Sequence, residues 1–181
     1  MGSIWIAGIM AGVVLVAGIA IYNGLVAARL RVREAWGAID VQLQRRASLI
    51  PALVETVKGY AGYERDTLQQ LTEARSAVGA AAGPRQAATA NAALSGALQS
   101  FLAVAEAYPD LKANARFAQL QTDLADTENK IAYARNYYNG AVETYNIKVE
   151  SIPGVVIAGP FGFKRAEFFS ADESARAVVA V

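Results

Sequence analysis

The chain opens with an unbroken apolar run and then changes to a periodic pattern. Residues 4–21 (IWIAGIMAGVVLVAGIAI) are apolar apart from their glycines, and the first charged side chain is Arg29. Because an α-helix rises about 1.5 Å per residue, about 20 such residues cross the ~30 Å hydrocarbon core of a bilayer. Trp5 and Tyr22 stand near the two ends of the run, where aromatic rings favour the membrane interface. The pattern predicts a transmembrane anchor over residues 1–28.

Other uses of such a run fit the N-terminal residues less well. A cleaved signal peptide carries basic residues before its apolar stretch, and residues 1–3 (MGS) contain none. N-myristoylation requires Ser or Thr at position 6, where this chain has Ile6. A pilin-like subunit also begins with an apolar helix that becomes amphipathic, but the charged residue that such subunits bury in that helix is missing here. A retained anchor is therefore the preferred interpretation.

Charge on the two sides of the run predicts its orientation. Five arginines follow it and none precedes it, namely Arg29, Arg31, Arg33, Arg45 and Arg46. The positive-inside rule assigns such a cluster to the cytoplasm. We therefore expect a single-pass protein of the cell (inner) membrane, with its N-terminus outside and residues 29–181 forming a cytoplasmic domain.

Apolar side chains after the anchor recur at spacings of three and four residues, which is typical of a helix packed in a bundle or coiled coil. Two columns of positions seven apart carry this pattern: Leu25, Val32, Ile39, Arg46, Leu53 and Tyr60, and Trp36, Leu43, Ile50, Val57, Glu64, Leu71 and Val78. The columns predict that the first helix leaves the membrane and continues to Val78. Pro51 removes one of its backbone hydrogen bonds and predicts a kink.

Glycine and proline divide the remaining chain into further helices. Residues 79–83 predict a turn, and Pro84 predicts the first residue of a second helix. A third helix, capped by Asp110 and ending by Pro153, has an apolar stripe of Phe117, Leu120, Leu124, Ile131, Tyr138, Val142 and Tyr145. Four phenylalanines are expected to hold the tail on the bundle before a short helix over residues 171–177: Phe161, Phe163, Phe168 and Phe169. The predicted fold class is all-α, an N-terminal transmembrane helix continuing into an antiparallel, mostly four-helix bundle.

Composition narrows the chemistry available to this fold. Hydrophobic residues make up 54% of the 181 residues, and cysteine and histidine are both absent. Their absence excludes thiol nucleophiles, disulfides, Cys/His zinc sites, Ser-His-Asp triads and the Glu-x-x-His motifs of di-metal bundles. The net charge of +1 gives no reason to expect nucleic acid as a partner. We predict no catalytic residue, no cofactor and no metal.

Polar residues inside the helical pattern leave two interpretations open. Asn129, Asn136, Asn139 and Asn146 are predicted at positions where helices meet and where asparagine fixes register. Charged side chains expected to pair across antiparallel helices are Arg45, Arg46, Glu55, Lys58, Glu128, Lys130 and Arg135. A buried polar site for a ligand or ion is the alternative, although buried charges need partners in any bundle. A carboxylate-dependent hydrolase would use Glu55, Glu64, Asp123 and Glu128, whose spacing is ordinary for a helix face.

Three blocks of the sequence together resemble one family. They are residues 35–60 (AWGAIDVQLQRRASLIPALVETVKGY), residues 108–145 (YPDLKANARFAQLQTDLADTENKIAYARNYYNGAVETY) and residues 161–175 (FGFKRAEFFSADESA). The strings RR-x-x-LIP-x-LV and TENKI-x-x-AR-x-YN are the most specific, and the chain is similar to the LemA family of bacterial membrane proteins. The resemblance implies a single N-terminal anchor, an antiparallel four-helix cytoplasmic bundle and no assigned enzyme activity.

The leading functional hypothesis is a non-enzymatic, membrane-anchored helical scaffold. It would contact the lipid bilayer and form a homo-oligomer or organise a membrane-protein partner. Gly8 and Gly12 form a GxxxG pair through which two anchors can approach closely. The alternative is an accessory docking subunit of an envelope-stress or membrane-protease system, and the third hypothesis is the carboxylate-dependent hydrolase.

Overall fold

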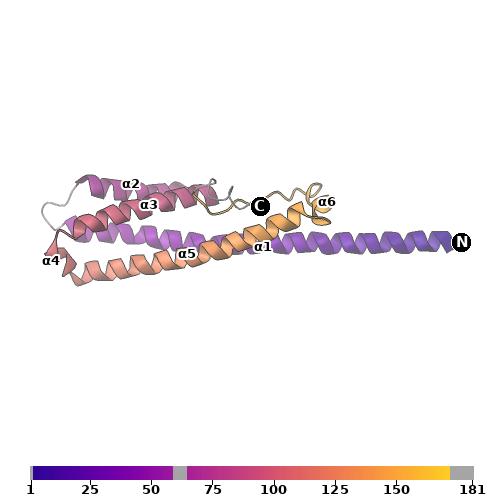
Figure 1. Cartoon of the computed structure of the whole chain (residues 1–181), viewed down its shortest axis with the longest axis horizontal. Helices are drawn as coiled ribbons and strands as arrows, with labels where there is room; N and C mark the ends of the chain where they lie inside the picture. Colours follow the sequence, from indigo (N-terminus) through magenta and orange to yellow (C-terminus); the bar gives the residue numbers. More distant parts are fainter. Residues whose placement is uncertain (1, 59–64, 172–181) are drawn as a thin grey trace, which may run out of the picture. The chain divides into compact units, whose positions relative to one another are not determined.

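A computed structural model describes residues 2–58 and 65–171, and these residues form helices joined by short connections (Figure 1). The helices are α1 (Gly2–Lys58), α2 (Arg65–Ala80), α3 (Pro84–Ala105), α4 (Pro109–Lys112), α5 (Ala115–Glu150) and α6 (Gly154–Ala158). No strand occurs among the described residues. The predicted all-α class is confirmed.

The chain divides into two compact units, and the long helices α1 and α5 contribute to both. Unit 1 contains residues up to Ala35 and the segment Tyr137–Glu167. Unit 2 contains Trp36–Asn136 and the residues from Phe168 onward.

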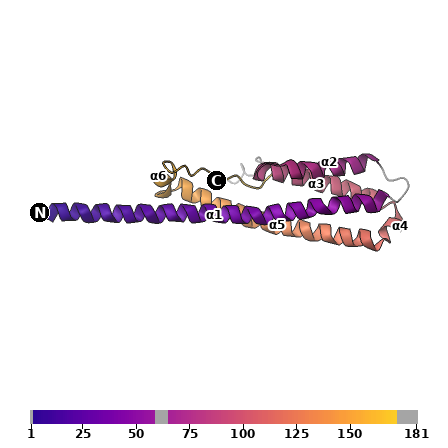
Figure 2. The ribbon, with the colours of Figure 1, turned by 180° about the vertical axis from the view of Figure 1, so that it is seen from behind.

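Unit 2 is a bundle of four antiparallel helices. Its parts of α1, α2, α3 and α5 lie side by side in both ribbon views (Figures 1 and 2). One apolar cluster joins them, formed by Ile50, Leu53, Val57, Leu71, Leu94, Leu98, Phe101, Ala105, Leu111, Phe117, Leu120 and Leu124. Arg46 precedes the cluster residues of α1, and it binds Glu128, which follows the cluster residues of α5. Sequence order therefore runs in opposite directions along α1 and α5.

The prediction of one helix from the membrane to Val78 is wrong. Helix α1 ends at Lys58, and α2 begins at Arg65. Arg75 Nε donates a hydrogen bond to the Ala47 carbonyl oxygen at 3.1 Å, although in one straight helix the two residues would lie about 42 Å apart. The chain thus reverses between α1 and α2, while Leu71 keeps its predicted place in the core. Tyr60 and Glu64 lie outside the described residues.

The later turns follow the sequence more closely. Gly83 has a φ of 86°, a left-handed conformation that favours glycine, and Pro84 follows it at the first turn of α3 as predicted. Asp110 was expected to cap the next long helix, and this is wrong because it lies inside the short helix α4. Asn114 is the cap instead, since its Oδ1 accepts hydrogen bonds from the backbone N–H groups of Arg116 and Phe117 at 2.9 and 3.2 Å.

In unit 1, polar side chains of α5 hold the segment that follows α6. Asn146 is buried, and its amide exchanges two hydrogen bonds with the Ala166 backbone at 2.8 and 3.0 Å. The Tyr145 hydroxyl donates to the Lys164 carbonyl oxygen at 2.9 Å. These bonds give the extended segment partners for the backbone groups of Ala166 and for the Lys164 carbonyl oxygen.

The phenylalanines of the tail do not all behave as predicted. Phe163 and Phe169 are buried and Phe168 is half-buried, which fits the expectation that they hold the tail. Phe161 is instead 61% exposed, so the expectation is wrong for this residue. The short helix predicted over residues 171–177 lies outside the described residues, apart from Ala171.

Candidate functional site

The first feature with functional potential is the exposed apolar part of α1, before Leu25. No described side chain before Leu25 is buried, and large apolar residues on every face of the helix are exposed. Helix α1 is the one described helix that is long and apolar enough to cross a membrane, with a mean hydropathy of 2.2 in its most apolar window. Leu25 begins a buried stripe that continues through Val32, Ile39 and Leu53. The predicted heptad columns of α1 are confirmed at these positions.

The second feature is a buried cation in unit 2. Arg46 occupies a heptad position of α1, and only 5% of it is exposed. Its Nη1 donates to Asn91 Oδ1 at 2.9 Å and to Ser95 Oγ at 3.0 Å, both on α3, and lies 2.5 Å from Glu128 Oε2 on α5. One arginine therefore ties three helices together. Arg46 and Glu128 both belong to the charged residues expected to pair across antiparallel helices, and for these two the expectation is confirmed.

The electrostatics of this cluster are those of a structural ion pair. Burial lowers the pKa of the Arg46 guanidinium, and the charge of Glu128 counteracts that shift. The Glu128 side chain is about half exposed, so water shares its negative charge. Arg46 Nε is buried without a hydrogen-bond partner. An arginine in this state positions helices, because it stays protonated and cannot exchange a proton near neutral pH.

Sequence reasoning missed the two α3 residues that receive Arg46. Asn91 is buried, and Ser95 is partly buried beside it. A signal was present, because Asn91 precedes the core residues Leu94 and Leu98 at spacings of three and seven. That spacing marks Asn91 as a core position, and a buried amide requires a partner.

The asparagines of α5 occupy different environments from those predicted. Asn129 and Asn136 are exposed, so their assignment to positions where helices meet is wrong. Asn146 is buried but binds the backbone of the tail rather than another helix. Asn139 is half-buried. The stripe that actually faces inward runs through Thr127, Ile131, Ala134, Tyr138 and Val142, two positions away from the exposed asparagines.

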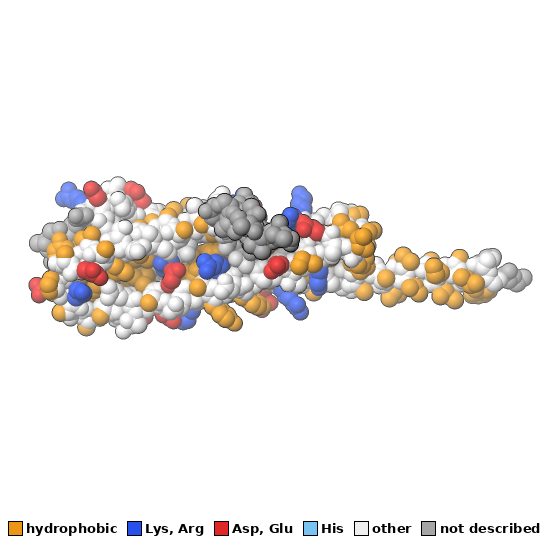
Figure 3. All heavy atoms as spheres, viewed as in Figure 1, with side chains coloured by type: hydrophobic (Ala, Val, Ile, Leu, Met, Phe, Trp, Pro, Cys, Tyr) orange, Lys and Arg blue, Asp and Glu red, His pale blue; other side chains and the backbone are white. Residues whose placement is uncertain are grey.

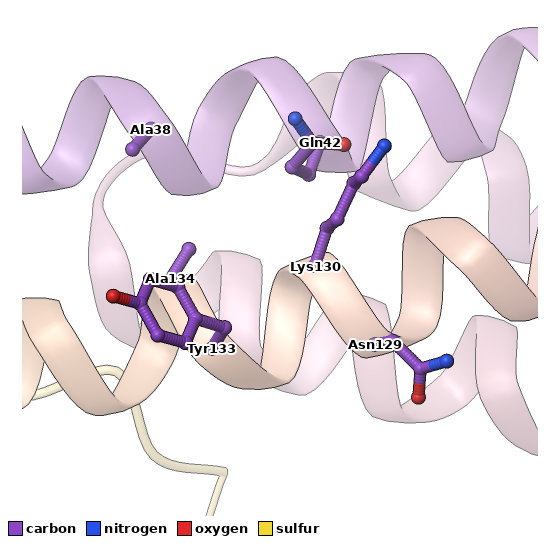
Figure 4. Close-up of a pocket in the computed structure, with 6 residues that line it drawn as sticks. All are labelled: Ala38, Gln42, Asn129, Lys130, Tyr133 and Ala134. Carbon is purple, nitrogen blue, oxygen red and sulfur yellow. The ribbon is translucent and has the colours of Figure 1, made fainter.

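A shallow groove of about 340 Å³ lies between α1 and α5 in unit 2 (Figure 4). Gln42 and Lys130 extend toward each other from the two helices, whereas Asn129 points away. Gln42 Oε1 is buried without a hydrogen-bond partner, and Lys130 Nζ binds Asp126 Oδ2 at 2.8 Å. The groove offers one free acceptor, and its lysine is already bound to a carboxylate of its own helix.

The four carboxylates considered for hydrolysis are not gathered at a site. Glu55 is exposed, Glu128 binds Arg46, and Asp123 accepts a hydrogen bond from Gln119 on its own helix at 3.2 Å. Glu64 lies outside the described residues. Within 2–58 and 65–171, no three acidic residues come close enough to hold a metal ion.

Unit 1 contains two tyrosines with perturbed acidity. Burial, together with the nearby charge of Glu167, raises the pKa of Tyr138 to about 12. Burial also raises the pKa of Tyr145. Both hydroxyls donate to backbone carbonyl oxygens of the tail. These tyrosines are therefore neutral structural donors at physiological pH.

Comparison with known proteins places the chain in a family. The LemA family profile matches residues 35–181. Magnetosome protein MamQ 2 of Paramagnetospirillum magneticum is 27% identical over 156 residues, which cover 72% of this chain and 57% of the relative. Protein LemA of Metamycoplasma hominis is 24% identical over 158 residues, which cover 85% of this chain and 71% of the relative. The chain spans little more than half the length of the MamQ protein that it matches. On the extent of the profile match, the chain belongs to the LemA family.

Proposed function

We propose that this protein is a non-enzymatic, membrane-anchored helical scaffold. Residues 1–28 cross the cell (inner) membrane with the N-terminus outside, and residues 29–181 form a cytoplasmic domain. The domain self-associates or organises a membrane-protein partner. The magnetosome name of the MamQ relatives is consistent with a membrane-associated role.

One observation supports the proposal above the others, namely the change of surface along α1. The helix is unbroken from Gly2 to Lys58, with exposed apolar residues before Leu25 and a buried stripe after it. Exposing that many apolar side chains to water is unfavourable, whereas a bilayer accommodates them. One helix that belongs both to a membrane span and to a bundle links the two, which is what an anchored scaffold requires.

Cysteine labelling tests the topology, because the chain has no native cysteine to interfere. Ser3→Cys precedes the span, and Ser100→Cys lies on the exposed surface of α3. In intact cells, we expect a membrane-impermeant maleimide to label position 3 and to label position 100 only after lysis. The opposite pattern would overturn the proposed orientation.

Self-association is tested through the GxxxG pair. A Cβ added at Gly8 or Gly12 meets no atom within 4 Å, so leucine at both positions does not disturb the chain itself. If two anchors approach through these glycines, Gly8→Leu with Gly12→Leu reduces cross-linking yield and oligomer size in mild detergent. Ile6→Leu with Met10→Leu is the matched control, because these exposed residues lie on the opposite face of α1. A monomer in wild type and both variants would contradict self-association and favour the docking alternative.

A further inference from the structure

A second apolar surface occurs in unit 1, far from α1 in the sequence. Residues 151–163 (SIPGVVIAGPFGF), here called the α6 loop, contain no charged side chain. Ile152 is 85% exposed, Val156 66% and Phe161 61%, while Gly154 and Ala158 are buried. In the space-filling view, hydrophobic side chains gather where α6 lies beside α1 (Figure 3). The loop thus has an inner face packed on the protein and an outer apolar face.

The loop is built so that few backbone groups are left without a partner. The N–H groups of Val155 and Val156 donate to the carbonyl oxygens of Ser151 and Pro153 at 2.9 and 3.3 Å. Those of Phe161, Gly162 and Phe163 donate to Ile157, Gly159 and Ala158 at 3.3, 3.1 and 2.9 Å. Two further positions are prolines, which have no N–H. A segment that inserts into lipid must have its backbone N–H and C=O groups hydrogen-bonded within the protein, because lipid offers them no partner.

Glycine allows the loop to fold this tightly. A Cβ at position 154 would overlap the Lys148 carbonyl oxygen, so a side chain there would push α6 away from the end of α5. The close approach turns Val155 and Val156 outward. The outer face is therefore fixed by the packing of the inner one.

The loop lies beside the membrane-spanning part of α1. Ile157 and Phe161 line an entirely apolar groove of about 450 Å³ together with Val14, Leu15, Gly18, Ile19 and Tyr22 of α1. The Phe161 ring meets the Tyr22 ring edge-on, with centroids 5.1 Å apart. Leu15 lies about 10 Å further along the axis than Tyr22. The loop and the groove therefore extend into the same stretch of α1 that is apolar on every face.

Charged groups surround the base of the loop. Glu150 and Arg165, at its two ends, form an ion pair at 2.9 Å. Lys164 is exposed beside them, and the Arg29 guanidinium lies 5.9 Å from the Phe163 ring centroid. An apolar tip with basic groups at its base matches the change from acyl chains to anionic headgroups across a bilayer surface.

We propose that the α6 loop is a second membrane contact, in which Ile152, Val155, Val156 and Phe161 insert among the lipid acyl chains of the leaflet at the Tyr22 end of the span. The inference rests on the proposed membrane span of α1 but not on its orientation. The occupant is lipid because the groove is continuous with the span, and whatever surrounds residues 14–19 also meets the loop. With two contacts, the protein is held against rotation and tilt about its single anchor.

Fluorescence quenching in vesicles tests the proposal on the full chain. Single cysteines are placed at exposed positions and labelled with an environment-sensitive fluorophore: Ile152→Cys and Val156→Cys in the loop, Val14→Cys in the span, and Glu143→Cys on α5 outside the loop. The chain is reconstituted into phosphatidylcholine–phosphatidylglycerol vesicles containing phospholipids with nitroxide-labelled acyl chains. Circular dichroism checks that each labelled protein retains its helices.

We expect lipid quenching at positions 152, 156 and 14 to exceed that at position 143 several-fold, with iodide quenching in the reverse order. Quenching at position 14 without quenching at 152 and 156 would overturn the loop contact and leave the span intact. No lipid quenching at any position would overturn the membrane span and the loop contact together. Protection of position 156 from both quenchers, increasing with the amount of protein per vesicle, would show that a second copy covers the loop and would also overturn the proposal.

Discussion

The two stretches of α1 are made from similar side chains but use them differently. Ile9 is 67% exposed, whereas Ile50, on the same helix, is 1% exposed. Around Ile9 every face of the helix is apolar and exposed. Around Ile50 the apolar run is short (residues 49–54, LIPALV), is flanked by charged and polar residues, and is buried along the face of Ile50 and Leu53. Apolar composition alone therefore does not distinguish a core helix from a membrane helix. The periodicity of the pattern does, because a bundle buries one face and a bilayer surrounds them all.

The largest effect should come from making the same substitution in both stretches. Ile50→Ala removes methyl groups from the core of unit 2 and should lower its free energy of unfolding by about 2–5 kcal/mol. Ile9→Ala removes the same atoms from an exposed position and should leave that free energy unchanged. Both free energies are measured by urea unfolding in detergent, with the fluorescence of Trp36 as the signal in a Trp5→Phe background. Trp36 suits this purpose because its ring lies 6.2 Å from that of Phe169 within unit 2.

Equal losses at positions 9 and 50 would contradict the division of α1 into an exposed apolar stretch, which we propose spans the membrane, and a core stretch. Ile50→Val is the graded control, since it deletes one methyl group and should cost only about 0.5–1.5 kcal/mol.

The buried cation gives the next largest effect. Arg46→Met keeps most of the side-chain volume but leaves the buried Asn91 Oδ1 without its donor, which should cost about 1–3 kcal/mol. Adding Asn91→Leu removes the stranded amide and should restore part of the loss. A double-mutant cycle from urea unfolding gives the coupling between the two positions. Strictly additive losses would show that Arg46 and Asn91 act independently.

Sequence predicted the parts of this fold that repeat and missed the parts that depend on one contact. The heptad columns located Ile39, Leu43 and Leu53 in the core, because burial of a helical face leaves a period in the sequence. The reversal after Lys58 was missed because Leu71 and Val78 continue the same period whether the helix runs on or folds back. Periodicity carries no information on direction.

The candidate sites show the same limit. Arg46 and Glu128 were expected to pair across helices because charges in a bundle need partners, although their specific partners were not predicted. Asn91 was not expected at all, since nothing local to it shows which helix faces it. The exposed face of the α6 loop was missed for a different reason. A segment rich in phenylalanine is expected to pack against the protein, and only the structure separates buried Phe163 from exposed Phe161.

A smaller effect should appear in unit 1, where side chains of α5 donate hydrogen bonds to the backbone of the segment that follows α6. The Tyr138 hydroxyl donates to the Glu167 carbonyl oxygen at 2.7 Å. Tyr138→Phe removes this bond and should cost about 1 kcal/mol. Hydrogen exchange of the amides in residues 163–167 should become faster, while exchange in α3 stays the same.

Alkaline titration sharpens the test of Tyr138. Its pKa is raised from 10 to about 12 in the folded chain, so folding favours the neutral phenol. The stabilisation is complete below pH 10 and is lost as the pH rises through about 12. Between those values, wild type should lose more stability than Tyr138→Phe, as measured by circular dichroism. Parallel losses in the two proteins would assign the alkaline transition to another group.

The smallest effect should come from a carboxylate two residues away from Glu128 on the same helix. Asp126 lies 2.8 Å from Lys130 and 3.5 Å from Arg45, and the hydrogen bond from Lys130 is the main cause of its lowered carboxyl pKa. All three side chains are exposed, so water and salt screen their interaction. At physiological salt, Asp126→Asn should leave the melting temperature unchanged, whereas Glu128→Gln, which weakens the bond to buried Arg46, should cost about 1 kcal/mol. Thermal melts of the two variants at low and high salt provide the comparison. If Asp126→Asn lowered the melting temperature as much as Glu128→Gln at both salt concentrations, the result would contradict the expectation that burial of the Arg46 cation makes its ion pair more stabilising than an exposed one.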